Sequence, residues 1–222
     1  MSVRRIPVIE RIMGANDALA LSNRELLDAQ RVHAVNLMAS PGAGKTSLII
    51  ALAHALQGRR RVIVLEGDVA SDVDTAQVRA AGIPAVQVNT GGACHLDATL
   101  VGVGLAQLDL ANADLLFIEN VGNLICPVGF ALGEHTRIAL ASIPEGDDKP
   151  LKYPGIYSAI DALVITKLDL LPYIAFDMAE FGRRVRSLNP DIRLFETSIV
   201  TGAGIAELAD WLVETTTTHG TG

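Results

Sequence analysis

The sequence of 222 residues contains only two cysteines and no long uninterrupted hydrophobic run. Two cysteines in an intracellular chain are more typical of free thiols or metal ligands than of a structural disulfide. The longest apolar stretches, such as 48–56, are interrupted by His, Gly or charged residues within about 15 residues, too short for a membrane-spanning helix. The charged start, Met1 to Arg5, is not followed by the apolar segment of an export signal. We therefore expect a cytoplasmic protein that does not bind membranes.

Positive charge is also scarce, because 18 Lys and Arg against 25 Asp and Glu leave a formal net charge of −7. Neutralising nucleic-acid phosphates requires a basic face, so we expect no nucleic-acid partner. Half of the residues are hydrophobic and only 19% are charged, which is typical of a globular chain and not of a disordered one. The length suits one α/β domain.

A glycine-rich segment, Ala39 to Ser47, lies between an apolar run and a predicted helix. This is the context of a phosphate-binding loop, in which successive backbone N–H groups surround the phosphates. Lys45 is expected to reach the β- and γ-phosphate oxygens, and the Thr46 hydroxyl to bind Mg²⁺. Ala39 stands where the strict pattern has Gly, which is tolerable if its φ is negative. The expected nucleotide-binding residues of the loop are Pro41, Gly42, Ala43, Gly44, Lys45, Thr46 and Ser47.

Strand-like and helix-like segments alternate along the chain. The predicted strands are apolar or β-branched runs at 35–38, 61–65, 84–88, 115–119, 138–142, 162–166 and 193–196. The predicted helices lie at 16–32, 45–57, 73–81, 95–108, 176–187 and 204–215. Buried strands that alternate with helices predict a three-layer α/β fold of the P-loop NTPase type, with a mainly parallel sheet and helices on both faces. The segment 143–158 is rich in Pro, Gly and charge and predicts a mobile loop.

Acidic residues follow two of the predicted strands, where ligands of parallel sheets collect. A nucleoside triphosphate with Mg²⁺ needs carboxylates there to hold the ion's water shell and to orient the attacking water. We therefore expect Asp68 and Glu119 to act in Mg²⁺ binding and, with Lys45, in catalysis. Asp74 is a further catalytic candidate that could equally be a helix-capping residue. Asp72 is interpreted as a helix cap.

A short motif after the strand 162–166 resembles the Asn-Lys-x-Asp motif of GTPases, with Thr166 in the place of Asn. Lys167 is expected to pack on the base and Asp169 to pair with guanine. The Asn side chain that braces neighbouring loops is missing, so we expect that brace to be lost. A second loop is expected to support the base through backbone N–H groups of Ser198, Ile199 and Val200. Together the two loops favour guanine over adenine.

Cys94 and His95 follow the predicted strand 84–88, and Cys126 follows the predicted strand 115–119, so all three are expected near the same edge of the sheet. Two thiolates and one imidazole suit Zn²⁺ or, in square-planar geometry, Ni²⁺. Three ligands are one short of a closed four-coordinate site, so two chains brought together at this edge could share an ion. The alternative interpretation is two buried cysteines and a helix-capping histidine. From the pattern alone both interpretations remain open.

The combined motifs closely resemble the HypB family, GTPases that help to insert nickel into [NiFe] hydrogenase. The resemblance covers about 16–214, and its most specific segments are Cys94-His95-Leu96-Asp97 and Glu119-Asn120-Val121-Gly122-Asn123-Leu124. It implies a GTP-dependent homodimer that binds GTP or GDP, with a Ni²⁺ or Zn²⁺ site formed by Cys94, His95 and Cys126 at the subunit interface. It also implies Mg²⁺ binding by Thr46 together with Asp68, Asp74 and Glu119. The implied partners are a HypA-type nickel chaperone and the hydrogenase large subunit.

Many members of that family carry a Cys-x-x-Cys motif or a histidine-rich tract near the N-terminus. The first cysteine here is Cys94 and the first histidine is His33, so tight N-terminal nickel binding is not expected. We divide the chain into an N-terminal segment with an amphipathic helix (1–32), a P-loop GTPase domain with an embedded metal site (33–215) and a disordered tail (216–222).

Three other functions remain as alternatives. The first is a related metal-delivery GTPase for urease or a cobalamin enzyme, and the second is a P-loop kinase acting on a small molecule. A kinase would need arginines over the phosphates, whereas Arg183, Arg184 and Arg186 lie on a late predicted helix. The third is a non-catalytic metal-binding module, which the intact Gly44-Lys45-Thr46 sequence disfavours.

Overall fold

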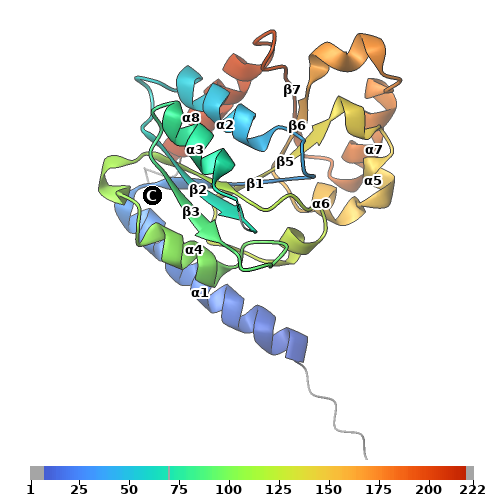
Figure 1. Cartoon of the computed structure of the whole chain (residues 1–222). Helices are drawn as coiled ribbons and strands as arrows, with labels where there is room; N and C mark the ends of the chain where they lie inside the picture. Colours follow the sequence, from blue (N-terminus) through green and yellow to red (C-terminus); the bar gives the residue numbers. More distant parts are fainter. Residues whose placement is uncertain (1–7, 70, 219–222) are drawn as a thin grey trace, which may run out of the picture.

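The computed structural model describes residues 8–69 and 71–218, and within them seven parallel strands form one sheet in the order β3-β2-β4-β1-β5-β6-β7 (Figure 1). All seven predicted strands are present, with ends that differ by up to three residues from the predicted ones. Their bounds are β1 His33–Ala39, β2 Val62–Asp68, β3 Ala85–Asn89, β4 Leu115–Glu119, β5 Thr136–Ser142, β6 Ala162–Thr166 and β7 Arg193–Glu196. The predicted α/β fold with a parallel sheet is confirmed.

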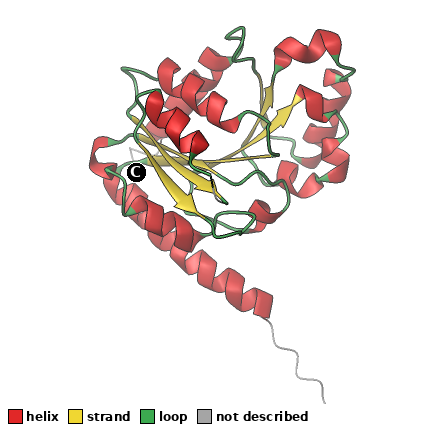
Figure 2. Cartoon of the chain, viewed as in Figure 1, coloured by secondary structure: helices red, strands yellow, loops and turns green. Residues whose placement is uncertain are grey.

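Helices cover both faces of this sheet, as Figure 2 shows. One face carries α2 (Lys45–Ala55), α3 (Val73–Ala80) and α8 (Ile205–Thr218). The other face carries α1 (Val8–Gln30), α4 (Ala98–Leu105), α5 (Lys149–Lys152), α6 (Pro154–Ser158) and α7 (Met178–Leu188). Short 3₁₀ turns occur at η1 (Leu110–Asn112), η2 (Cys126–Gly129), η3 (Ile143–Glu145) and η4 (Leu168–Tyr173). None of the helices in the described ranges is long and apolar enough to cross a membrane.

The two-residue period of the strands divides the core between these faces. In β1, Val35 and Leu37 pack with the α2, α3 and α8 side, whereas Ala34 and Met38 pack with helices of the opposite face. Every residue of β1 and β4 is buried. Strands covered on both faces have continuous apolar runs, which is why the sequence identified them.

The segment 143–158 is not the mobile loop that its composition predicted. It forms η3, α5 and α6, and it buries Ile143, Ile156 and Tyr157. A reciprocal capping box between Ser142 and Glu145 fixes its start. Pro and Gly occur here at short helix starts and ends, so composition alone gave the wrong prediction.

Both ends of the chain also differ from the predicted boundaries. Helix α1 begins at Val8, before the predicted position 16, and its N-terminal turns extend beyond the rest of the molecule (Figure 1). Leu27 of α1 is fully buried in the core, so the N-terminal segment packs on the same sheet as the rest of the chain. Residues 216–218, expected in a disordered tail, belong to α8, and 219–222 lie outside the described residues.

The strand register decides which acids meet at the carboxyl edge of the sheet. Glu66 of β2 lies directly beside Glu119 of β4, and Leu37 of β1 lies on the other side of Glu119. Asp68 lies two residues further along β2, beside Asn89 of β3. The register therefore places Glu66, and not Asp68, next to Glu119.

Candidate nucleotide and metal site

The loop between β1 and α2 has the geometry of a phosphate-binding loop. Gly44 is the N-cap of α2 with φ of 95°, a left-handed conformation that a side chain would strain. Ala39 ends β1, and its φ is not positive. An alanine in place of the glycine of the strict pattern therefore causes no backbone strain. The N-terminal end of α2 directs its backbone N–H groups and its dipole toward a bound anion.

A cavity of about 410 Å³ opens in front of this loop. Its walls come from the loop and α2, from α3, from the end of β4, and from the segments after β6 and β7. The lining residues are Gly42, Ala43, Gly44, Lys45, Thr46, Ser47, Leu48, Asp74, Gln77, Glu119, Thr166, Lys167, Thr197 and Ile199. The expected phosphate loop and both expected base-binding segments therefore face the same space, with Pro41 outside its lining.

Glu119 is buried beneath the phosphate-binding loop, with 4% of its surface exposed. Its Oε1 accepts a hydrogen bond from the Thr46 hydroxyl at 3.0 Å and lies 3.8 Å from Nζ of Lys45. Its Oε2 is buried and has no hydrogen-bond partner within the described residues. A buried carboxylate oxygen without a partner is costly, and a divalent cation bound at Thr46 would satisfy it.

Three acids form a cluster here, which we call the carboxylate cluster: Glu66, Asp74 and Glu119. One carboxylate oxygen of each lies within 4.8 Å of the other two. Burial is the largest cause that raises the pKa of Glu119 to about 8 and that of Glu66 to about 7, and the neighbouring acids add to it. Three oxygen donors under a phosphate-binding loop suit Mg²⁺, which favours carboxylates together with phosphates.

Asp68 is not a member of the carboxylate cluster, although the sequence suggested it. Its Oδ1 accepts a 3.4 Å hydrogen bond from the backbone of Ser71, at the start of the loop that leads to α3. Glu66, which the sequence interpretation passed over, takes the position instead and also accepts a hydrogen bond from the Thr75 hydroxyl. The sequence shows two acids, Glu66 and Asp68, at the end of an apolar strand. Only the register with β4 determines which of them lies beside Glu119.

Of the predicted base-binding residues, Lys167 and Ile199 line the cavity, whereas Asp169, Ser198 and Val200 do not. Lys167 adopts a left-handed conformation (φ 61°), and its Nζ donates to the Gly42 carbonyl at 2.7 Å. The Thr166 hydroxyl donates to the Ala43 carbonyl at 2.8 Å. The expectation that Thr166 leaves the loops without a brace is therefore wrong, because its hydroxyl ties β6 directly to the phosphate-binding loop.

The second base-binding segment is held to the first through Asp169, which accepts a hydrogen bond from the Ser198 hydroxyl. The backbone N–H of Ser198 donates to the Ala203 carbonyl at 3.1 Å, so it is already used inside its own loop. Ile199 lines the cavity, whereas Val200 is 77% exposed and does not. Of the three predicted residues, Ile199 is therefore the best placed to contact a base.

Cys94, His95 and Cys126 are brought together at the same edge of the sheet, and we call them the thiol cluster. Cys94 and His95 lie in the loop after β3, and Cys126 begins η2, after β4. One ligand atom of each lies within 4.8 Å of the other two, and Sγ of Cys94 is 3.6 Å from Nδ1 of His95. Cys94 is exposed and the other two are half-buried, which excludes the interpretation of two buried structural cysteines.

The chemistry of the cluster suits a soft or borderline cation. Hydrogen bonding to Cys126, with burial second, raises the pKa of the Cys94 thiol, and burial lowers the pKa of His95. A neutral imidazole is the form that binds metals, and a bound cation would replace the proton shared by the thiols. The three donors leave at least one coordination position to be filled from outside.

Asn123 holds the two halves of the thiol cluster together. Its amide Nδ2 donates to the Cys94 carbonyl at 3.3 Å, and its Oδ1 accepts from the backbone N–H of Cys126 at 3.3 Å. Gly122, the preceding residue, packs against the phosphate-binding loop: a Cβ atom there would approach Cα and N of Pro41 to 3.0 Å. The segment that carries Cys126 is thus in direct contact with the phosphate-binding loop.

Comparison with known proteins is consistent with this arrangement. The model of the CobW/HypB/UreG nucleotide-binding domain matches residues 33–196, which is well over half of the chain. The chain belongs to the CobW/HypB/UreG family. The HypB hydrogenase maturation factor of Azotobacter vinelandii is 46% identical over 209 residues, covering 94% of this chain and 69% of that protein.

Two solved HypB structures are similar throughout. The structure of Helicobacter pylori HypB in complex with nickel has a TM-score of 0.89 and 33% identity, and the match covers 94% of this chain and 98% of that one. HypB from Archaeoglobus fulgidus has a TM-score of 0.85 and 38% identity, over 91% and 99% of the two chains. The resemblance to HypB, first drawn from the motifs, is confirmed by sequence and fold.

Proposed function

We propose that this protein is a GTP-hydrolysing metallochaperone that assists nickel insertion into [NiFe] hydrogenase. One observation carries the proposal: the thiol cluster and the phosphate-binding loop lie at one edge of one sheet, with Gly122 against Pro41 between them. A nucleotide-dependent change at the loop can therefore reach the metal ligands directly. The maturation role is the one named for its relatives, such as the Azotobacter vinelandii protein.

In the nucleotide half of the mechanism, the loop N–H groups and Lys45 hold the phosphates. Nζ of Lys45 lies 3.8 Å from Oε1 of Glu119. If Nζ moved to the phosphates of a bound nucleotide, Glu119 would lose this ion pair. Mg²⁺ would be held by Thr46 and the carboxylate cluster, and when bound it supplies charge neutralisation at the β- and γ-phosphates. Glu119 and Asp74 are the candidates to orient the attacking water, and Asp68 stands outside this group.

In the metal half, Ni²⁺ or Zn²⁺ is cargo held by Cys94, His95 and Cys126, and a second copy of the chain completes the coordination. Such a homodimer, formed with GTP and released after hydrolysis, would link nucleotide state to metal affinity. A HypA-type nickel chaperone and the hydrogenase large subunit are the proposed donor and acceptor, in the cytoplasm. The P-loop kinase alternative is not favoured, because the described lining of the cavity includes no arginine and Arg184 pairs with Glu180 on α7.

The test is analytical ultracentrifugation in which nucleotide and Ni²⁺ are varied independently, with phosphate release measured from GTP and from ATP. We expect dimer with the analogue GTPγS and Mg²⁺, monomer with GDP, and faster phosphate release from GTP. Cys94→Ala should preserve GTP hydrolysis but remove the effect of Ni²⁺ on the dimer fraction. A dimer fraction and a Ni²⁺ affinity that are equal with GDP and GTPγS would contradict the proposal.

A further inference from the structure

Asn120 follows Glu119 at the end of β4 and is 1% exposed. Its side-chain Oδ1 accepts hydrogen bonds from the backbone N–H groups of Leu96 and Val121, both at 3.0 Å. Leu96 directly follows His95, so a residue next to the buried acid of the nucleotide site anchors the loop that carries two metal ligands. Asn120 does not line the nucleotide cavity.

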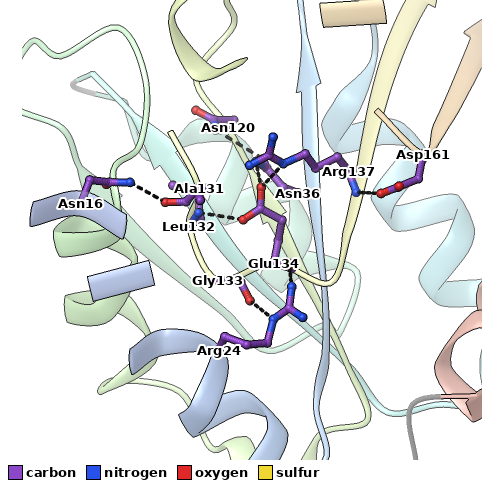
Figure 3. A network of polar contacts seen from close by, with 10 residues as sticks. All are labelled: Asn16, Arg24, Asn36, Asn120, Ala131, Leu132, Gly133, Glu134, Arg137 and Asp161. Atoms are coloured by element: carbon purple, nitrogen blue, oxygen red, sulfur yellow. Dashed lines mark hydrogen bonds and ion pairs between the residues drawn. The ribbon is translucent and has the colours of Figure 1, made fainter. Parts of the chain in front are cut away.

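A buried polar network fixes the orientation of the Asn120 amide. Its Nδ2 donates to Oδ1 of Asn36 at 3.3 Å, and Nδ2 of Asn36 donates to Oε1 of Glu134 at 3.3 Å. Figure 3 shows Glu134 between Asn36, Arg137 and the backbone of Leu132. Because the Glu134 carboxylate is an acceptor, Asn36 must present its NH₂ to Glu134 and its oxygen to Asn120. Asn120 must then present its own oxygen to Leu96.

Glu119, the last residue of β4, and Asn120, directly after it, face opposite ways, as the strand period predicts. Glu119 contacts Thr46 of the phosphate-binding loop, whereas Asn120 contacts Leu96 of the metal-ligand loop. The Asn120 backbone N–H also donates to the Leu37 carbonyl at 3.0 Å, which keeps this end of β4 in register with β1. A displacement of Glu119 therefore moves Asn120, and with it the backbone beside His95.

We propose that Asn120 is the positioning residue that couples the nucleotide site to the thiol cluster, through its hydrogen bond to the Leu96 backbone and with its amide held by Asn36. This inference rests on the proposed function, because it names the residue through which nucleotide state alters metal affinity. Asn120 belongs neither to the lining of the nucleotide cavity nor to the thiol cluster. Its role is to transmit a small movement of β4 to the loop of Cys94 and His95.

The test is the ratio of the Ni²⁺ dissociation constants measured with GDP and with GTPγS, each with Mg²⁺, in matched variants. Asn120→Ala should bring the ratio at least threefold closer to one, while GDP affinity changes less than twofold. Asn120→Asp keeps an oxygen opposite Leu96 but places a second oxygen against Oδ1 of Asn36, so it should also bring the ratio closer to one. As a control, Asn189→Ala removes two side-chain hydrogen bonds, to Tyr157 and Ile160, far from both sites and should not change the ratio.

An unchanged ratio in Asn120→Ala would overturn the inference and leave the proposed function intact, whereas a ratio of one in the unmodified protein would overturn both. Hydrogen exchange in the unmodified protein provides a test that needs no variant. The Leu96 amide should exchange at least threefold differently with GDP and with GTPγS, while the Glu180 amide, which donates to Asp177 at the start of α7, should not. Equal exchange at Leu96 would overturn the inference.

Discussion

The carboxylate cluster and the thiol cluster lie at one edge of the same sheet, but they are built in different ways. The carboxylate cluster rests on strand register, since Glu66 and Glu119 are direct neighbours on paired strands, and these two acids are buried. The thiol cluster lies on two loops, and Cys94 is exposed. Burial raises the pKa values of Glu66 and Glu119, whereas the thiol cluster is open to solvent on at least one side.

The two clusters differ in where the remaining ligands of a bound ion would come from: the same chain with its nucleotide, or a second molecule. An ion in the carboxylate cluster would find its remaining partners in Thr46 and in the phosphates of a nucleotide held by the same chain. An ion in the thiol cluster needs a further donor, and the exposed position of Cys94 leaves room for a second molecule. The proposed resident and transferable metals would therefore have different surroundings in one fold.

The first prediction separates the two clusters by removing the phosphate-binding lysine. Lys45→Ala should lower GTP hydrolysis by at least about 100-fold, because a preorganised positive charge at the phosphates is lost. Ni²⁺ affinity measured with GDP should change less than twofold, since Lys45 contacts none of the thiol-cluster residues. Phosphate release and Ni²⁺ titration check this. Lys152→Ala, which removes a surface ion pair with Asp148, is the matched control and should hydrolyse GTP normally. Hydrolysis within tenfold of normal in Lys45→Ala would contradict the assigned role.

The second prediction affects the opposite cluster. Cys94→Ala should weaken Ni²⁺ and Zn²⁺ binding by about 30-fold, as expected when one donor of a soft site is removed. GDP affinity should remain within twofold, because the exposed thiol makes no contact with the phosphate-binding loop. Metal titration and GDP titration of the same preparation give both values. An unchanged metal stoichiometry and affinity would show that the three side chains are not a metal site.

The third prediction concerns the pH dependence of the free energy of unfolding, which the buried acids of the carboxylate cluster should control. The pKa of Glu119 is raised to about 8 and that of Glu66 to about 7 in the folded protein, from an ordinary value of 4.5. The folded state therefore retains protons that the unfolded chain releases, so the free energy of unfolding falls as pH rises from about 5 to about 8. We expect a loss of several kcal/mol over this range in ligand-free protein, since each unit of pKa shift corresponds to about 1.4 kcal/mol.

Urea denaturation at pH 5.5 and pH 8 measures that loss. Glu119→Gln should flatten the dependence, because a neutral amide replaces the titrating group, whereas Cys94→Ala should leave it unchanged below pH 8. Saturating GDP and Mg²⁺ should reduce the loss, since bound cation favours the ionised carboxylates. A free energy of unfolding that rises over this range would mean that the acids of the carboxylate cluster are ionised in the free protein.

The fourth prediction concerns the tertiary contact that supports the nucleotide side alone. Thr166→Val keeps the side-chain shape but removes the buried hydrogen bond to the Ala43 carbonyl, which should cost about 1 kcal/mol of stability. GDP affinity should fall slightly and Ni²⁺ affinity should not change. Thr217→Val on the exposed face of α8 is the control and should cost less than about 0.5 kcal/mol. Equal effects in both variants would mean that Thr166 does not brace the loop.

Local patterns predicted the elements that have local causes. The glycine-rich turn after a buried strand located the phosphate-binding loop, and continuous apolar runs such as that of β4 located the strands. The segment 143–158 was predicted wrongly, because the burial of Ile156 and Tyr157 depends on packing against distant elements. The helix predicted at 16–32 is present as α1, but the sequence did not predict its long-range contacts, in which Asn16 and Asn23 bond to the start of α4 and to the loop 131–132.

The chemistry of both clusters was already encoded in residue type and spacing: a lysine and a threonine after a glycine turn, acids at strand ends, and two cysteines with a histidine. Spacing along a chain does not specify which neighbouring strands pair or in what register, because those choices depend on the energy of the whole sheet. Pairing β2 with β4 selected Glu66 over Asp68, and folding the β4 end against the β3 loop created the contact between Asn120 and Leu96. Residue chemistry was therefore readable from the chain, whereas the connection between the two sites arose only from long-range packing.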